Sequence, residues 1–140
     1  MFTNILVAYD GSEHSKKAAK LAADLARQQH HGAVLWIVTV MLASPWEMGE
    51  PYFSQFIEQR TLAGQNLMRE AIEMLGNGLE IHNELLFGNP AESIIKVAET
   101  RACDLIVMGT RGLGLLQGLL LGSQAQKVIS HAHCPVLVVK

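Results

Sequence analysis

Residues 105–123 read LIVMGTRGLGLLQGLLLGS, a short apolar run followed by a glycine-rich segment. The run Leu105–Met108 has the composition of a parallel strand that is covered on both faces. Glycines let the backbone approach a ligand closely, and exposed backbone N–H groups in such a segment bind anions. Ser123 can open a helix, whose N-terminus offers free donors and a partial positive charge. A strand, a glycine loop and a helix start in this order predict a phosphate-binding site.

The glycine spacing narrows the kind of site. Gly109 and Gly112 bracket two residues, and nine residues separate Gly112 from Gly122-Ser123. No Lys follows the glycines as in a Walker A motif, and a dinucleotide fingerprint would follow the first strand. From spacing alone, a glycine-rich surface loop without a ligand is an equal alternative. Gly122 is expected to leave room for phosphates and, if the loop uses it there, to supply a positive φ.

Short apolar runs alternate with helical stretches along the whole chain. The five runs are Ile5–Tyr9, Val34–Val40, Leu79–Leu86, Leu105–Met108 and Val136–Val139. This alternation predicts an α/β fold with an open parallel sheet and helices on both faces. The first and fourth runs are the most continuously apolar and should be central neighbours. The third run alternates with Glu80, His82 and Glu84 and should form an exposed edge.

The ends of four helices can be predicted from capping residues. Ser12 caps a first helix, and a second spans about Phe53–Leu75. Asn89 caps a third, with Pro90 at its first position, and the fourth runs from Ser123 to near His131. The inner stripe of the first helix is expected to hold Ala18, Leu21, Ala22, Leu25 and Ala26. Residues 41–52 suggest a long loop, for which partner contact and coverage of the sheet are equal alternatives.

Composition limits the partners and the compartment. The 140 residues suit one domain, 1–140, and the net charge of −2 argues against nucleic acid or an anionic membrane as main partner. No apolar run approaches the ~18 residues of a membrane span, and the N-terminus lacks signal-peptide features, so a cytoplasmic protein is expected. Cys103 and Cys134 are expected to be reduced, buried thiols, with a redox pair left open.

The predicted crevice lies where the first and fourth strands end. Ligands of open parallel sheets bind beyond the carboxyl ends of the strands. Asp10 ends the first strand and Gly109 the fourth, so Asp10 should stand opposite the start of the glycine loop.

Three segments carry a family resemblance: ILVAYDGSEHSKKAAKLA (5–22), DLIVMGTRGLG (104–114) and LLLGSQAQKVISHAHCPVLVVK (119–140). They resemble the universal stress protein family, and the Gly-x2-Gly-x9-Gly-Ser spacing is that of its ATP-binding branch. The resemblance implies a Rossmann-like sheet of order 3-2-1-4-5, an adenine nucleotide such as ATP, and Mg²⁺ or Mn²⁺ with the phosphates. It also implies a homodimer through 135–139, a strand whose apolar edge carries no charge before Lys140.

The resemblance assigns roles by position. Asp10, with Ala8 and Tyr9 before it, would lie near the ribose and the metal, and the backbone of Val40 would recognise adenine. Met108 and Gly109 would flank ribose and base. The residues expected to face the phosphates are Arg111, Gly112, Gly122, Ser123 and Gln124. Two positions depart from the family pattern: Gln117-Gly118 replaces a common basic residue, and Gln124 stands where a small or β-branched residue is usual.

Other functions find less support in the sequence. There is no nucleophile elbow, no cysteine with an evident base and no paired carboxylates, so at most slow ATP hydrolysis is expected. Asp10 as a phosphoacceptor lacks an acidic neighbour and a Lys. His131, His133 and Cys134 suggest a metal site, but a histidine at a helix C-terminus is the simpler interpretation. A nucleotide-free interaction protein of the same fold is the main rival to a nucleotide-dependent regulatory module in the stress response.

Overall fold

The computed structural model describes residues 1–42, 49–110 and 121–140, which form alternating strands and helices. The strands are β1 (Asn4–Ala8), β2 (Val34–Met41), β3 (Glu80–Phe87), β4 (Leu105–Gly109) and β5 (Val136–Val139). The helices are α1 (Glu13–Gln28), α2 (Tyr52–Leu75), α3 (Pro90–Thr100) and α4 (Ser123–His131). The predicted element order is confirmed, with boundaries shifted by a residue at several ends.

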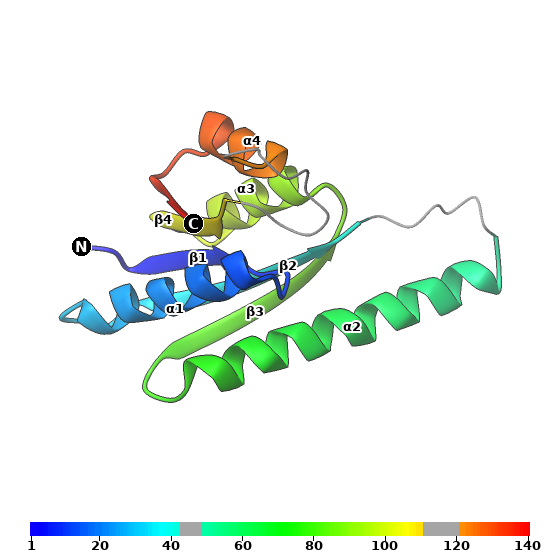
Figure 1. Cartoon of the computed structure of the whole chain (residues 1–140), viewed down its shortest axis with the longest axis horizontal. Coiled ribbons are helices and arrows are strands. Elements are labelled where there is room, and N and C mark those ends of the chain that lie inside the picture. Colours follow the sequence, from blue (N-terminus) through cyan, green and yellow to red (C-terminus); the bar gives the residue numbers. More distant parts are fainter. Residues whose placement is uncertain (43–48, 111–120) are drawn as a thin grey trace.

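The sheet is parallel throughout, in the order β3-β2-β1-β4-β5 (Figure 1). β1 lies in the middle, where Ile5 pairs with Leu35 on one side and with Leu105 on the other. This confirms the predicted α/β fold and the predicted adjacency of the first and fourth strands. β3, with its alternating charged residues, forms one edge, and β5 forms the other.

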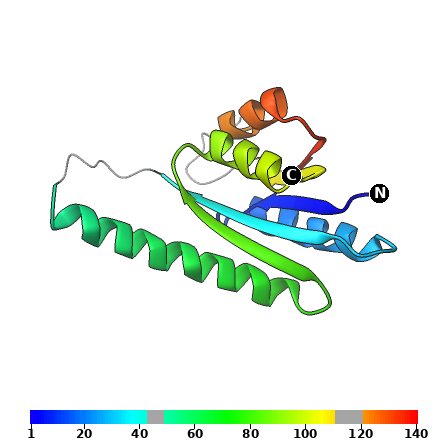
Figure 2. The same ribbon diagram turned by 180° about the vertical axis from the view of Figure 1, so that it is seen from behind.

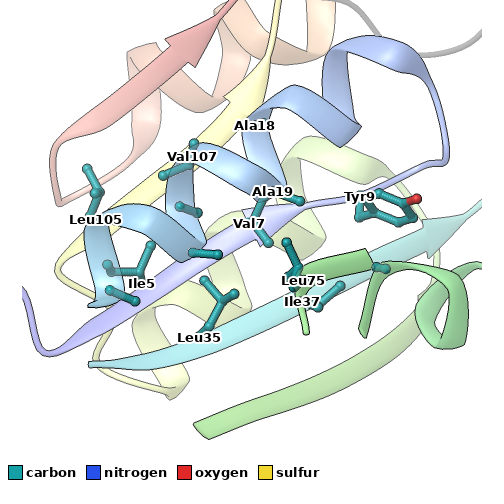
Figure 3. Packing of buried hydrophobic residues seen from close by; sticks show 14 of the residues in the cluster. Ile5, Val7, Tyr9, Ala18, Ala19, Leu35, Ile37, Leu75, Leu105 and Val107 are labelled. Atoms are coloured by element: carbon teal, nitrogen blue, oxygen red, sulfur yellow. The ribbon is translucent and has the colours of Figure 1, made fainter. Parts of the chain in front are cut away.

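Helices cover both faces of the sheet (Figures 1 and 2). α1 and α2 lie on the face to which Ile5, Val7 and Leu35 point, and Figure 3 shows this cluster. α3 and α4 lie on the other face, which receives Leu6 and Ile106. Side chains of a strand alternate between faces, so β1 supplies both clusters and is wholly buried from Ile5 to Val7.

The predicted helix starts are confirmed by their hydrogen bonds. The hydroxyl of Ser12 accepts from the Ser15 N–H at 3.2 Å, and the Asn89 side chain accepts from the Glu92 N–H at 3.2 Å. Pro90 occupies the first turn of α3 as expected. Each cap satisfies a backbone donor that the first turn of a helix leaves without a partner.

The predicted inner stripe of α1 is wrong at Leu21, which is 37% exposed. The buried apolar residues of α1 are Ala18, Ala19, Ala22, Ala23 and Ala26. At 3.6 residues per turn, Ala19 and Ala23 move the centre of the buried face away from Leu21. Small alanine side chains let α1 lie close to the sheet. The face that carries them is therefore buried in preference to the face that carries the larger Leu21.

Two further expectations concern the predicted loop 41–52 and the absence of a membrane-spanning segment. Within the predicted loop 41–52, residues 43–48 lie outside the described residues, so its proposed roles stay predictions. Among the helices that the structure describes, none is long and apolar enough to cross a membrane.

Candidate functional site

A cavity of about 430 Å³ opens at the carboxyl ends of β1, β2 and β4. Nine predicted site residues line it: Ala8, Tyr9, Asp10, Val40, Met108, Gly109, Gly122, Ser123 and Gln124. The other two, Arg111 and Gly112, lie outside the described residues. Small-molecule sites commonly enclose ~300–1,000 Å³, so the cavity has the size of a ligand site.

Asp10 is held at the cavity by the turn that joins β1 to α1. One carboxylate oxygen, Oδ1, accepts from the Ser12 N–H at 2.9 Å. Gly11 has a φ of +84°, and a Cβ there would lie 2.6 Å from Cδ2 of Leu67. Both the conformation and the space therefore favour glycine at this turn, which fixes the direction of the Asp10 side chain.

Asp10 is also the only carboxylate among the described lining residues. Across the described ranges, no group of three or more His, Cys, Asp or Glu residues could hold a metal ion. A single carboxylate suits Mg²⁺, which is usually bound through one or two carboxylates together with substrate phosphates. The site thus fits a metal that arrives with a phosphorylated ligand better than a resident metal.

Thr110, which sequence reasoning missed, ties three elements together just after the end of β4. Its carbonyl accepts from the Gly122 N–H at 2.7 Å, and its own N–H donates to the Val139 carbonyl at 2.9 Å. Its hydroxyl lies 2.8 Å from Nδ1 of His14 in α1. Thr110 is only 7% exposed. The only sequence signal was a polar residue directly after a buried strand, inside the glycine motif.

Packing alone requires a glycine at position 109. A Cβ at Gly109 would lie 2.6 Å from Cβ of His14 and 3.0 Å from its backbone carbonyl carbon. Backbone atoms of α1 cannot give way as a flexible side-chain end can. The first glycine of the motif therefore allows α1 to approach the end of β4.

The start of α4 faces the cavity without a side-chain cap. Gly122 is the N-cap residue, and among the described residues no side-chain cap hydrogen bond is made there. Ser123 follows at the cavity lining. Uncapped donors at a helix N-terminus form an anion site. The suggested positive φ at Gly122 is wrong, because its φ is −69° and its ψ 156°, an extended conformation open to any residue.

Gln124 joins the starts of two helices. Its Oε1 accepts from the Ala91 N–H at 3.1 Å, so α4 caps the first turn of α3. Gln124 lines the cavity, yet its amide oxygen is already engaged. Its expected contact with phosphates stays a prediction, and the structure adds a role in joining α3 to α4.

The opposite end of the cavity is formed by the ends of β1 and β2. The Tyr9 N–H donates to the Val38 carbonyl at 2.9 Å, and the buried Thr39 hydroxyl donates to the Tyr9 carbonyl at 2.9 Å. The Tyr9 ring belongs to the cluster under α1 and α2 (Figure 3). Burial, followed by the charge of Glu70, raises the pKa of its phenol. These bonds hold the end of β2, directly before Val40, against the end of β1.

Arg60 of α2 also lines the cavity, which the sequence did not indicate. Its guanidinium carbon lies 5.0 Å from the centroid of the Phe56 ring, one helical turn before it. No motif surrounds Arg60, and only the packing of α2 brings it to the cavity.

The cysteines lie apart from this site. Cys103 and Cys134 are free thiols beside a smaller cavity of about 130 Å³. Burial raises the pKa of Cys103 to about 12 and also raises the pKa of Cys134. A thiol that stays protonated at neutral pH is a poor nucleophile, which favours reduced thiols over a redox pair. Cys103 is buried as expected, whereas Cys134 is only partly buried.

The histidines of the alternative metal site have separate partners. Nδ1 of His131 lies 3.0 Å from the Lys127 carbonyl at the end of α4. Nε2 of His133 lies 3.1 Å from a carboxylate oxygen of Glu99 in α3. These contacts support the helix-end interpretation of His131.

Comparison with known proteins agrees with this architecture. The model of the universal stress protein family matches residues 1–140. A curated universal stress protein from Thermus aquaticus, described as lying in the QAH/OAS sulfhydrylase 3′ region, is 46% identical over 140 residues and is matched over 100% of both chains.

Solved structures give the same result. Universal stress protein UspA from Lactobacillus plantarum has a TM-score of 0.87 at 26% identity, with 99% of this chain and 97% of that chain covered. A universal stress protein solved in complex with cAMP has a TM-score of 0.75 at 26% identity, with 99% and 97% covered. Because the family model spans all 140 residues and the Thermus aquaticus relative matches from end to end, the chain belongs to the universal stress protein family.

Proposed function

We propose that this protein binds ATP, or a closely related adenine nucleotide, and acts as a nucleotide-dependent regulatory module in the stress response. The observation that carries the proposal is the single cavity that joins Asp10 and Val40 to the uncapped start of α4. The likeness to a family member in complex with cAMP supports an adenine nucleotide as the ligand class.

The proposed orientation follows from the two ends of the cavity. Phosphates lie at Gly122 and Ser123, where helix donors and the helix dipole favour negative charge. Adenine lies beside Val40, where backbone groups at the end of β2 can recognise its edge. Asp10 lies near the ribose and holds Mg²⁺ or Mn²⁺ through the phosphates.

We propose binding without fast turnover. The described lining residues include one carboxylate and no Lys, so they offer no acidic pair and no ammonium beside the phosphates. Bound ATP should therefore persist far longer than a kinase cycle, whose rates are ~1–100 s⁻¹. Turnover in that range by purified protein, lost in Asp10→Ala, would show an enzyme instead.

Native mass spectrometry of freshly purified protein tests the proposal most directly. A retained adenine nucleotide adds a defined mass to the chain, and calorimetry with ATP and AMP, each with and without Mg²⁺, then measures affinity. ATP should bind more tightly than AMP because most of the donors address phosphates. No retained mass together with no binding of ATP or AMP would favour the nucleotide-free interaction module.

We further propose that the protein acts in the cytoplasm as a homodimer paired through 135–139. The support is the position of β5 at the sheet edge, where the strand Val136–Val139 has only apolar side chains. Apolar sheet edges without charge or cover favour strand pairing with a second chain.

A further inference from the structure

The positive charge in the described lining of the cavity comes from an element that the sequence did not indicate. Among the described lining residues, Arg60 is the only cation, and it belongs to α2 instead of the glycine loop. α2 packs against β2, β3 and α1, whereas α4 packs against β5 and α3. Arg60 therefore enters the cavity from the side of β2, away from Ser123 at the start of α4.

Arg60 is exposed, and its guanidinium lies over an aromatic ring. Its Cζ lies 5.0 Å from the centroid of Phe56. Within residues 1–42, 49–110 and 121–140 it makes no ion pair and no hydrogen bond. A guanidinium that stacks on a ring with one face keeps its other face available for a second planar group.

The end of β2, against which α2 packs, contributes apolar residues to the cavity lining. Val40, Met41 and Leu42, at the end of β2, form the same side of the cavity. Such surroundings suit a flat aromatic ligand group better than a phosphate, which is better served by the N–H donors of α4. The chemistry at this end of the cavity is that of a stacking site.

We propose that Arg60 contacts the ligand and stacks on its planar base, so that the base packs on a guanidinium held in place by Phe56. This inference rests on the proposed function and adds a residue that selects for the base. The phosphates remain at the start of α4, at the other end of the cavity.

The test compares the affinities of ATP and adenosine by calorimetry, with adenosine also measured by competition. Arg60→Gln should weaken both ligands by the same factor, about 3- to 10-fold, because both carry the base. Arg60→Lys should bind both ligands nearly as weakly as Arg60→Gln does, since an ammonium keeps the charge but has no plane that can stack on the base. Phe56→Leu should cause a smaller loss, because the guanidinium remains but is no longer held by the ring.

Arg69→Gln is the matched control. Arg69 lies on the same helix, is exposed and contacts Asn66 at 3.2 Å, so its loss should leave both affinities unchanged. Urea unfolding of each variant confirms that the fold is intact.

Three outcomes contradict the inference. If Arg60→Gln weakens ATP but not adenosine, Arg60 addresses phosphates. If it changes neither, or if Arg60→Lys binds like the wild type, stacking on the base is wrong while the proposed function stands. A wild-type protein that binds neither ligand overturns the proposed function, and this inference with it.

Discussion

Gly109 ends β4 and is also the first glycine of the spaced motif. A Cβ there would lie 2.6 Å from Cβ of His14 and 3.0 Å from the carbonyl carbon of the same residue. Gly109→Ala should therefore lower the free energy of unfolding by about 1–3 kcal/mol without any nucleotide, as overpacking does. Urea unfolding of the nucleotide-free protein measures this cost.

Gly64→Ala is an informative comparison. Its Cβ would meet Cδ1 of Leu85 at 2.5 Å, the end of a flexible side chain. Gly64 also lies inside α2, where alanine gains about 1 kcal/mol in helix propensity. Gly64→Ala should therefore stay near wild-type stability. Equal losses in both would mean that the α1 backbone does not limit the space at Gly109.

Two substitutions can separate the contributions of Gly122 and Ser123 to the proposed binding of ATP. Gly122→Val should weaken ATP severely, by filling space that phosphates need, since the extended φ of Gly122 imposes no backbone strain on valine. Ser123→Ala should cost only about 1 kcal/mol, because it removes one hydroxyl and keeps the helix N–H groups. Calorimetry with ATP and AMP decides, and an unaffected Gly122→Val would place the phosphates elsewhere.

Cys103 gives stability a pH dependence in the alkaline range. Burial, and then nearby Cys134, raise the pKa of its thiol from 9.0 to about 12. Below the unfolded pKa the thiol is protonated in both states. As pH rises from about 9 towards about 12, the unfolded chain loses this proton first, and stability falls by at most about 1.4 kcal/mol per pH unit.

Unfolding curves at pH 8, 9.5 and 10.5 should show this loss, and Cys103→Ala should show a smaller one. The phenol of Tyr9, whose pKa is also raised, contributes equally to both proteins. Cys134 interacts with Cys103, so the difference in slope reports on Cys103 together with its coupling to Cys134. Identical slopes would show that its pKa is not raised by folding.

At the scale of elements, α3 and α4 begin side by side, and a side chain of α4 accepts from the first turn of α3. Oε1 of Gln124 accepts from the Ala91 N–H at 3.1 Å. Gln124→Ala should cost about 0.5–1.5 kcal/mol of stability in the nucleotide-free protein, whereas Gln124→Glu keeps an acceptor at the start of α3 and should cost less. Thermal unfolding of the wild type, Gln124→Glu and Gln124→Ala should show stability falling in that order. If both variants match the wild type, the contact contributes nothing to stability.

The elements themselves were largely predictable from sequence, because their signals are local. Asn89 and Pro90 mark the start of α3, and the apolar runs mark the strands. The buried face of α1 was predicted wrongly at Leu21. Periodicity alone does not tell which of two overlapping faces of the helix packs on the sheet. Arg60 and Thr110 were missed because their roles depend on the packing of α2, α1 and β5, which no local pattern encodes.

For the whole molecule, the open edge at β5 predicts the assembly. Leu137 and Val139 pack on the cluster under α1, and Val136 on the cluster under α3 and α4, whereas Val138 belongs to neither cluster. Val138→Lys should therefore leave the core intact while it places a charge on the edge strand. Sedimentation should show a dimer for the wild type and a monomer for the variant at micromolar concentration. A wild-type monomer, unchanged by the substitution, would contradict pairing through this strand.

The hydrogen bonds of Thr110 connect the two events proposed for this protein. Its carbonyl accepts from the Gly122 N–H, where the phosphates are proposed to bind, and its own N–H donates to the Val139 carbonyl in the edge strand. A ligand that shifts Thr110 therefore acts on the strand that would pair with a second chain. Linkage is reciprocal: whatever factor nucleotide adds to the dimerisation constant, dimerisation adds to the affinity for nucleotide. The response to a change in nucleotide level would then depend on protein concentration, so one chain would register the supply of ligand and its own abundance together.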